Sequence, residues 1–219
     1  MEQLKIESND GFLHLKDLPH NCIFNKVVTG CGATTIALQN AEDYVIAVPT
    51  TELIINKTDI TQAGLSKLTY NGIRPFGLFG NFDTEAKRQL NEYVSTSGTK
   101  KILCTYDKIP RLLDYIEARK YRLLVDEYHC LLKAYSYRQK AIDGVLDNFR
   151  QFKSFCFMSA TPILASFKPD CLEDVEEVQA DWGDSQEKLK VELQQTNKPY
   201  TLAANIINAY KRDGFITSE

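Results

Sequence analysis

Short apolar runs recur along the first three quarters of the chain, and polar or amphipathic segments separate them. Each run carries hydrophobic residues at consecutive positions, as strands do when both of their faces are buried. The runs lie at 21–28, 44–49, 73–79, 101–106, 121–127 and 154–162. Because helical patterns alternate with these strands, we predict an α/β fold with a doubly wound, mainly parallel sheet and helices on both faces.

Amphipathic periodicity predicts the helices between these strands. The clearest stripe lies at 141–152, where apolar residues follow the spacing i, i+3, i+4 and i+7. The segment 83–94 begins with Asp83, a residue type that caps helix N-termini. Further helices are predicted at 34–39 and 109–118. We interpret these apolar stripes as faces that pack on the core.

The composition is that of a globular domain, since 43% of the 219 residues are hydrophobic and 25% are charged. The six cysteines form no C-x-x-C pair, so we interpret them as buried reduced thiols, with a zinc site or a disulfide as the alternative. No stretch reaches the ~18 apolar residues of a membrane span, and the N-terminal residues lack the apolar core of a signal peptide. We therefore expect a cytoplasmic protein that is not bound to membranes.

Charge and pattern both change near residue 169. Residues 170–187 hold eight Asp or Glu and no Lys or Arg, although the whole chain has a net charge of only -3, which by itself does not indicate nucleic-acid binding. One further strand at 172–180 and a helix at 199–211 are predicted. We therefore predict one domain over 1–168, followed by an acidic linker and the start of an incomplete second domain over 169–219. The acidic segment is either a hinge or a plain solvated linker.

A glycine turn between the first strand and the first helix has the form of a phosphate-binding loop. In such loops backbone N–H groups converge on anionic oxygens, a lysine neutralises the phosphates and the next hydroxyl holds Mg²⁺. Thr34 stands at the metal position, but Ala33 stands where the lysine belongs and Val27 where the first glycine belongs. Taken alone, the turn fits a plain strand–turn–helix connection equally well.

Lys26 lies just upstream of this turn, at the end of the incoming strand. A lysine stem is long and flexible enough to reach the same phosphates from the other side of the loop. Our hypothesis is that Lys26 replaces the missing lysine, and the alternative is a solvated charge at a strand end. The predicted nucleotide contacts are Lys26, Thr29, Gly30, Cys31, Gly32, Ala33, Thr34 and Thr35.

Two more motifs follow apolar strands. The first is Asp126-Glu127-Tyr128-His129. In phosphoryl transfer, a carboxylate at a strand tip can hold Mg²⁺ and its neighbour can orient or deprotonate the attacking water. Both would project from the carboxyl edge of the sheet, where doubly wound folds bind ligands. The second motif is Ser159-Ala160-Thr161, whose hydroxyls can bond a carboxylate or a nucleic-acid strand, unless it is only a turn ended by Pro162.

The order of these three motifs resembles the first half of a superfamily 2 helicase motor of the DEAH/DEAD type, over about residues 20–165. D-E-x-H followed about 30 residues later by S-A-T-P is its more specific part, and the glycine loop is deviant. The resemblance implies a RecA-like P-loop NTPase that uses ATP and Mg²⁺. It makes Gly30, Gly32 and Thr34 phosphate and metal contacts, Asp126 the Mg²⁺ carboxylate and Glu127 the catalytic base. His129, Ser159 and Thr161 become couplers to the nucleic-acid site, although His129 also fits a satisfied histidine at a helix start.

The same resemblance suggests a nucleic-acid path and a second motor domain. The segment VIAVPTTELI is similar to motif Ia of the family, which would place Thr50 and Thr51 on the nucleic-acid backbone. The segment ILCTYDKI would likewise place Thr105 and Tyr106 near the strand. Such motors use two RecA-like domains, and no later motif with paired arginines is found. We therefore expect an ATP-hydrolysing motor domain, incomplete in this chain, that acts on nucleic acid, in the form of single-stranded DNA or RNA, together with a second motor domain in cis or in trans.

Two other readings of these motifs stay open. The chain could be a degenerate helicase-like module that binds nucleotide or nucleic acid without turnover, because the loop lysine is missing. It could also be a phage-type DNA-packaging or nuclease-associated ATPase, a class in which displaced loop lysines occur. The S-A-T-P segment favours the helicase interpretation over the packaging one, and the presence of Asp126 and Glu127 favours turnover.

Overall fold

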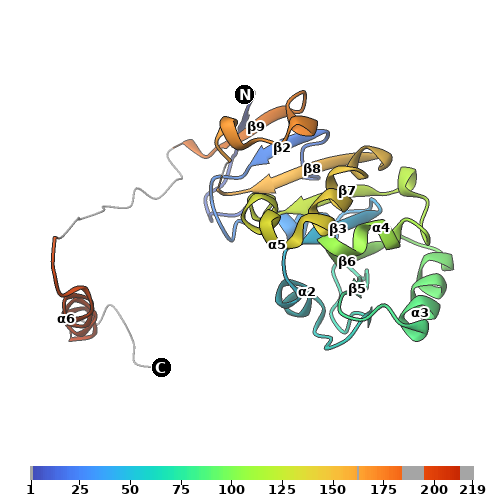
Figure 1. Cartoon of the computed structure of the whole chain (residues 1–219), viewed down its shortest axis with the longest axis horizontal. Helices are drawn as coiled ribbons and strands as arrows, with labels where there is room; N and C mark the ends of the chain where they lie inside the picture. Colours follow the sequence, from blue (N-terminus) through green and yellow to red (C-terminus); the bar gives the residue numbers. More distant parts are fainter. Residues whose placement is uncertain (1, 162, 184–194, 213–219) are drawn as a thin grey trace. The chain divides into compact units, whose positions relative to one another are not determined.

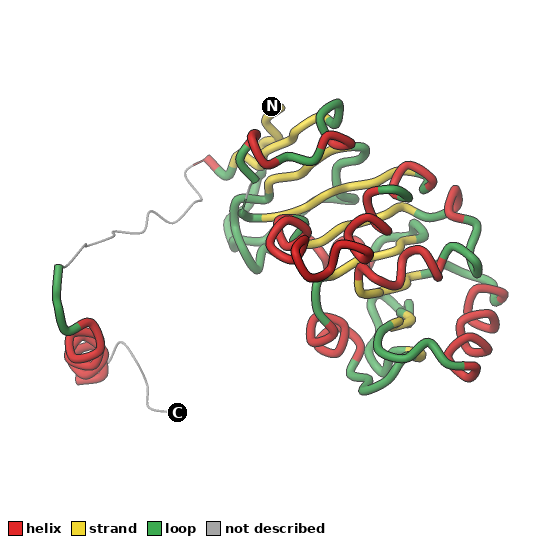
Figure 2. Tube along the Cα trace, in the orientation of Figure 1, coloured by secondary structure: helices red, strands yellow, loops and turns green. Residues whose placement is uncertain are grey.

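The computed structural model describes residues 2–161, 163–183 and 195–212, and within them the dominant element is a nine-stranded sheet (Figures 1 and 2). Its strands lie in the order β1-β9-β2-β8-β7-β3-β6-β5-β4. All neighbouring strands pair in parallel except β4 and β5. The strands are β1 (Glu2–Lys5), β2 (Cys22–Asn25), β3 (Tyr44–Val48), β4 (Gly64–Leu65), β5 (Phe76–Leu78), β6 (Lys101–Thr105), β7 (Arg122–Asp126), β8 (Ser154–Ser159) and β9 (Glu176–Asp181).

Helices cover both faces of this sheet. They are α1 (Ala33–Gln39), α2 (Thr51–Thr58), α3 (Thr84–Ser95), α4 (Ile109–Leu112) and α5 (His129–Leu146); a further helix, α6 (Pro199–Arg212), belongs to a separate unit of the chain. Successive strand residues enter different cores: Leu123 and Val125 pack with residues of α3, α4 and α5, whereas Leu124 packs with residues of α1 and α2. This alternation is what a strand buried on both faces requires. It confirms the predicted α/β class, the mainly parallel sheet and the helices on both faces.

The parallel arrangement of the strands determines where a functional site can form. Strands β2, β3, β6, β7 and β8 run side by side in one direction, so their carboxyl ends meet at one edge of the sheet. The residues that follow these strands are Lys26, Pro49, Tyr106, Glu127 and Ala160. The glycine loop, the D-E-x-H and S-A-T motifs and the two predicted nucleic-acid segments therefore all lie at the same edge of the sheet.

Two predicted helices have different bounds in the structure. Helix α5 begins at His129 and ends at Leu146, so the predicted helix at 141–152 is displaced. Its apolar stripe does face the core, but the last turn tightens into the 3₁₀ helix η3 (Phe149–Gln151), in which Phe149 is buried. Helix α4 ends at Leu112 rather than at residue 118. After Leu112 the chain continues in hydrogen-bonded turns, so the apolar pattern extends beyond the last helical residue.

The acidic segment contributes a strand to the sheet. Strand β9 pairs with β1 on one side and with β2 on the other, although it lies beyond the predicted boundary at residue 168. The chain divides instead into a compact unit over 1–186 and a second unit over 187–219, whose described part is helix α6. Whether that unit begins a second domain stays a prediction. Residues 184–187 of the acidic segment lie outside the described residues.

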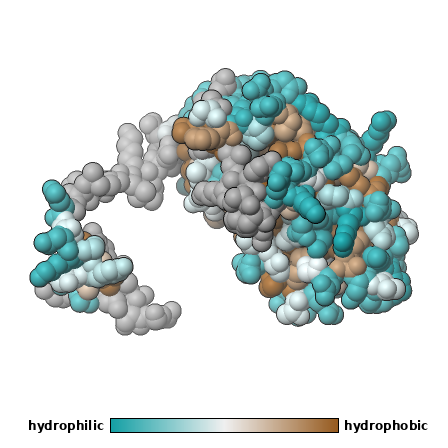
Figure 3. All heavy atoms as spheres, viewed as in Figure 1, coloured by the Kyte–Doolittle hydropathy of each residue, from teal (hydrophilic) through white to brown (hydrophobic). Residues whose placement is uncertain are grey.

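None of the six cysteines, all of which lie in the described part of the chain, forms a disulfide, and four of them are buried. No group of three or more His, Cys, Asp or Glu side chains among the described residues could hold a metal ion. In the same part of the chain, no helix combines the length and the apolar character needed to cross a membrane. The face in Figure 3 carries many hydrophilic side chains with smaller hydrophobic patches between them.

A buried lysine makes the stability of this fold depend on pH. Lys101, at the start of β6, is fully buried and donates to the side-chain oxygen of Asn40 at 2.6 Å and to the carbonyl of Glu42 at 2.5 Å. Burial lowers the pKa of its ammonium from 10.5 to about 7, although Asp43 and Glu42 act in the opposite direction. Between these two values the unfolded chain binds more protons than the folded one, so stability rises with pH.

We therefore expect the free energy of unfolding to rise by about 2 kcal/mol between pH 7 and pH 9 through this group. Lys101→Met should remove that slope, because methionine keeps an unbranched stem without a titrating amine. Urea unfolding at both pH values measures it. Lys100→Met, at the adjacent lysine, is the matched control and should keep the wild-type slope. A slope that survives in Lys101→Met would assign the pH dependence to other groups.

Candidate functional site

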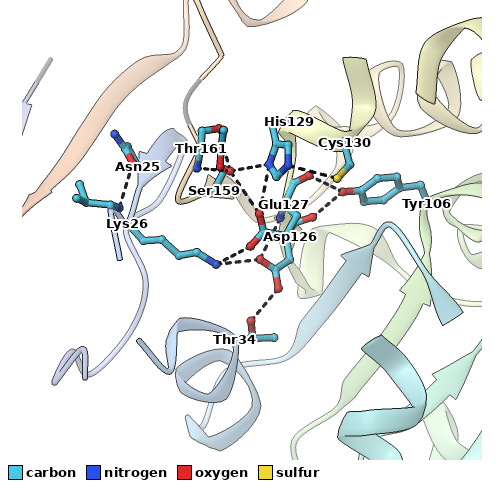
Figure 4. Close-up of polar contacts among 11 residues, drawn as sticks. Asn25, Lys26, Thr34, Tyr106, Asp126, Glu127, His129, Cys130, Ser159 and Thr161 are labelled. Carbon is cyan, nitrogen blue, oxygen red and sulfur yellow. Dashed lines mark hydrogen bonds and ion pairs between the residues drawn. The ribbon is translucent and has the colours of Figure 1, made fainter. Parts of the chain in front are cut away.

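Polar side chains from five chain segments converge at the carboxyl edge of the sheet (Figure 4). Lys26 follows β2 and Thr34 lies in the first turn of α1. Asp126 is the last residue of β7, and Glu127 follows it. His129 opens α5, and Ser159 ends β8. The structure thus brings together residues that are up to 133 positions apart, counted from Lys26 to Ser159.

Lys26 is the cation of this cluster. Its Nζ lies 2.9 Å from Oε1 of Glu127 and 3.6 Å from Oδ1 of Asp126, and its side chain is 7% exposed. Burial disfavours the ammonium charge, but the two carboxylates outweigh that effect and raise the pKa of Lys26 above 10.5. The lysine is therefore charged at neutral pH, and its burial excludes the alternative of a solvated charge at a strand end.

Asp126 joins the lysine to the glycine loop. Its Oδ2 accepts a hydrogen bond of 2.8 Å from the Thr34 hydroxyl, while its Oδ1 faces Lys26. Burial raises the pKa of Asp126, and Lys26 and Thr34 oppose this rise by favouring the carboxylate. A buried carboxylate is costly to keep unless it is paired and hydrogen-bonded. Asp126 has both kinds of partner.

Glu127 connects the lysine to His129 and Ser159. Its Oε2 lies 3.3 Å from Nδ1 of His129 and accepts a 3.4 Å hydrogen bond from Ser159. The Ser159 hydroxyl is also 2.8 Å from Nδ1 of His129. It accepts from the backbone N–H of Thr161 at 2.9 Å, so Thr161 takes part through its backbone. A continuous polar network therefore runs from Lys26 through Glu127 to the end of β8.

The backbone is strained on both sides of this network. Among the residues that the structure describes, five other than glycine have a positive φ, and three of them are Asn or Asp, which tolerate that conformation. The other two are Val27, with φ 62°, and Glu127, with φ 52°. Val27 is β-branched and sits in a tight turn closed by a 2.6 Å bond from Val28 N–H to the Lys26 carbonyl. Such conformations cost about 1–3 kcal/mol each and cluster at functional sites.

The glycine loop borders a cavity of about 250 Å³. Gly30 and Gly32 both have positive φ, with values of 70° and 79°, which explains why glycine occupies these turn positions. The cavity is lined by Phe12, Lys26, Gly30, Cys31, Gly32, Ala33, Thr34, Thr35 and Lys57. It therefore includes all the predicted nucleotide contacts except the exposed Thr29.

The four predicted nucleic-acid contacts are placed unequally. Thr50 is exposed at the N-cap of α2, and Thr51 lines a groove of about 450 Å³ beside that helix. Thr105 is buried at the end of β6, with only 7% of its surface exposed. Tyr106 is 4% exposed and points inward, so it presents no surface to a nucleic-acid strand. Its side chain instead reaches the carboxylate turn, because the chain enters the 3₁₀ helix η1 (Tyr106–Lys108) directly after β6.

Sequence reasoning missed three residues around this site. Phe12 and Lys57 line the cavity from the N-terminal segment and from α2. Trp182, the chain's single tryptophan, is buried, and its indole N–H donates to the carbonyl of Lys26 at 2.9 Å. No local pattern marks Trp182, because its link to Lys26 depends on β9 lying beside β2 in the sheet.

No protein-family model matches the chain, and no curated protein matches it in sequence.

Proposed function

We propose that the chain is an ATP-binding and ATP-hydrolysing motor domain of the superfamily 2 helicase type, which acts on nucleic acid together with a second motor domain. The observation that carries this proposal is the convergence of Lys26, Thr34, Asp126 and Glu127 at one sheet edge. A cation, a hydroxyl and two carboxylates are the groups that phosphoryl transfer uses. Their position beyond the carboxyl ends of parallel strands supports a nucleotide site of the P-loop, RecA-like kind.

The residues present fit a nucleotide with Mg²⁺. Thr34 and Asp126 lie in hydrogen-bond contact, so one hard cation could contact both oxygens. When bound, Mg²⁺ would neutralise charge on the phosphates. Lys26 would supply the positive charge that Ala33 cannot, because its buried ammonium borders the loop cavity. Phosphate oxygens could replace the carboxylates as partners of the Lys26 ammonium, because the lysine stem is flexible.

Glu127 is the group best placed to accept a proton from the attacking water. It is the more exposed of the two carboxylates, at 27% against 10% for Asp126, and so more accessible to water. Asp126 is held by Thr34 and Lys26 for the metal role. His129 and Ser159 are hydrogen-bonded to each other, and both lie close to Glu127. They could therefore couple the position of Glu127 to the end of β8.

Nucleic acid and a second motor domain are the partners in this proposal. Thr50 and Thr51 begin helix α2 at the same sheet edge as the carboxylates, which suits contact with a backbone that passes along this edge. Thr105 ends β6 on the same edge but is buried, so Thr50 and Thr51 are the surface contacts in this proposal. Hydrolysis measured with single-stranded DNA and with single-stranded RNA, against no nucleic acid, tests this part. A rate that neither polymer changes would contradict a nucleic-acid motor.

The metal position can be tested with neighbouring threonines. Thr34→Val should weaken Mg²⁺-dependent ATP binding about tenfold, because it removes a hydroxyl that donates to the metal carboxylate. Titrations with ATP in Mg²⁺ and in EDTA, followed by Trp182 fluorescence, measure this effect. Thr35→Val is the matched control, since Thr35 lines the same cavity but is not the predicted metal residue.

ATP binding and hydrolysis by the wild-type chain test the proposed function as a whole. ATP binding and Mg²⁺-dependent hydrolysis by the wild-type chain, alone or with its second domain, are the expected results. Binding without turnover under all of these conditions would favour the degenerate module. The absence of ATP binding at millimolar concentration would overturn the proposed function. Equal losses in Thr34→Val and Thr35→Val would move the metal site away from Thr34.

A further inference from the structure

The hydroxyl of Tyr106 is tied to the backbone that carries both carboxylates. It donates to the carbonyl of Asp126 at 2.5 Å and lies 3.2 Å from the carbonyl of Glu127 (Figure 4). The ring is buried in the core cluster that also contains Val125, Tyr128 and Ile109. Tyr106 thus combines a fixed ring with one polar atom directed at a single turn.

That turn needs support because of its conformation. Glu127 has φ 52°, a left-handed conformation that glycine, Asn and Asp tolerate better than glutamate does. The Glu127 carbonyl also accepts from Cys130 N–H at 2.8 Å, which secures the side of the turn that leads into α5. The bond from Tyr106 to the Asp126 carbonyl secures the side that leaves β7. Together these bonds hold Glu127 in a conformation that its own residue type disfavours.

Tyr106 also links the ends of two strands that are not neighbours in the sheet. It follows Thr105, the last residue of β6, whereas Asp126 ends β7. Strand β3 lies between them, so β6 and β7 are not paired in the sheet. The Tyr106 side chain therefore bridges from the exit of β6, past the end of β3, to the carboxylate turn. We propose that Tyr106 is a positioning residue that holds Glu127 in place for attack by water, a role that rests on the proposed function.

Tyr106→Phe tests this role, because phenylalanine keeps the buried ring and removes only the hydroxyl. The expected result is a kcat for ATP hydrolysis about tenfold lower, with KM changed less than about twofold. Tyr93→Phe is the matched control. The Tyr93 hydroxyl also bonds to backbone groups, Lys101 N–H at 2.9 Å and the Arg74 carbonyl at 3.1 Å, but near the opposite end of β6. It should leave kcat and KM within about twofold of wild type.

A second measurement does not depend on turnover. Amide hydrogen exchange across residues 126–130 should be faster in Tyr106→Phe than in wild type or Tyr93→Phe. Unchanged exchange in this turn would overturn the proposal, as would equal kcat values in Tyr106→Phe and Tyr93→Phe. A loss confined to KM would also overturn it. If wild type itself does not hydrolyse ATP under any condition, the proposed function fails, and the exchange measurement still shows whether Tyr106 holds the turn.

Discussion

Replacing Lys26 by alanine is expected to weaken ATP binding by about 10- to 100-fold and to abolish detectable hydrolysis, because a charge-assisted hydrogen bond contributes about 1.5–3 kcal/mol. Lys26 is the cation that contacts Asp126 and Glu127, and it borders the glycine-loop cavity. In the variant, no side chain on the loop would neutralise the phosphates, since Ala33 occupies the usual lysine position. Isothermal titration with ATP and Mg²⁺ measures the loss of affinity.

A control variant must separate a lost ligand contact from a damaged fold. Lys57 lines the same cavity from α2, so Lys57→Ala removes a positive charge from the cavity without touching the carboxylates. It should weaken ATP binding much less than Lys26→Ala does. Lys26→Ala also leaves Asp126 buried without its cation, which is destabilising. Thermal unfolding of each variant must therefore accompany the titrations.

The ATP affinities of Lys26→Ala and Lys57→Ala show which residue supplies the positive charge that the deviant loop lacks. If a folded Lys26→Ala protein binds ATP as tightly as wild type, Lys26 is only the structural partner of the carboxylates. If Lys57→Ala shows the larger loss, the phosphate cation is on α2 and not at the end of β2. A loss specific to Lys26 would support the replacement of the loop lysine by a residue seven positions upstream of Ala33.

The convergence of the site could be predicted because it depends on strand direction. Lys26, Asp126 and Ser159 each stand at or just after the end of an apolar strand. Parallel strands bring such positions to one edge whatever their separation in sequence. The structure places Lys26 beside Asp126, and both Lys26 and Ser159 contact Glu127, the residue after Asp126, as that reasoning requires. Their catalytic and binding roles stay predictions.

The supports of the site could not be predicted, because they depend on sheet order and on local backbone conformation. Trp182 reaches the Lys26 carbonyl only because β9 is inserted between β1 and β2. The positive φ of Val27 and Glu127 contradicts the preference of both residue types, so no local signal exists for it. The resemblance of the segment ILCTYDKI to a helicase segment predicts that Tyr106 lies near nucleic acid, whereas in the structure Tyr106 is buried where the chain enters η1.

Glu127→Gln is expected to lower kcat for ATP hydrolysis by about 10²- to 10⁴-fold, the usual contribution of a general base. The amide keeps the shape of the side chain but cannot accept a proton from water at neutral pH. Nucleotide affinity should be equal to wild type or higher. The reason is that the Lys26 ammonium, 2.9 Å from Oε1 of Glu127, would no longer be shared with this carboxylate and would interact more strongly with phosphates. Single-turnover hydrolysis and equilibrium titration measure the two effects separately.

Glu52→Gln is the matched control, because Glu52 lies in the first turn of α2 at the same sheet edge but outside the network. It should change neither kcat nor affinity. The split between turnover and binding distinguishes a base from a residue that only holds Lys26. A purely structural Glu127 would lose affinity together with rate once Lys26 lost its partner. A base would lose rate alone, so Glu127→Gln that hydrolyses ATP at the wild-type rate, or that binds ATP more weakly, would remove Glu127 from the catalytic role.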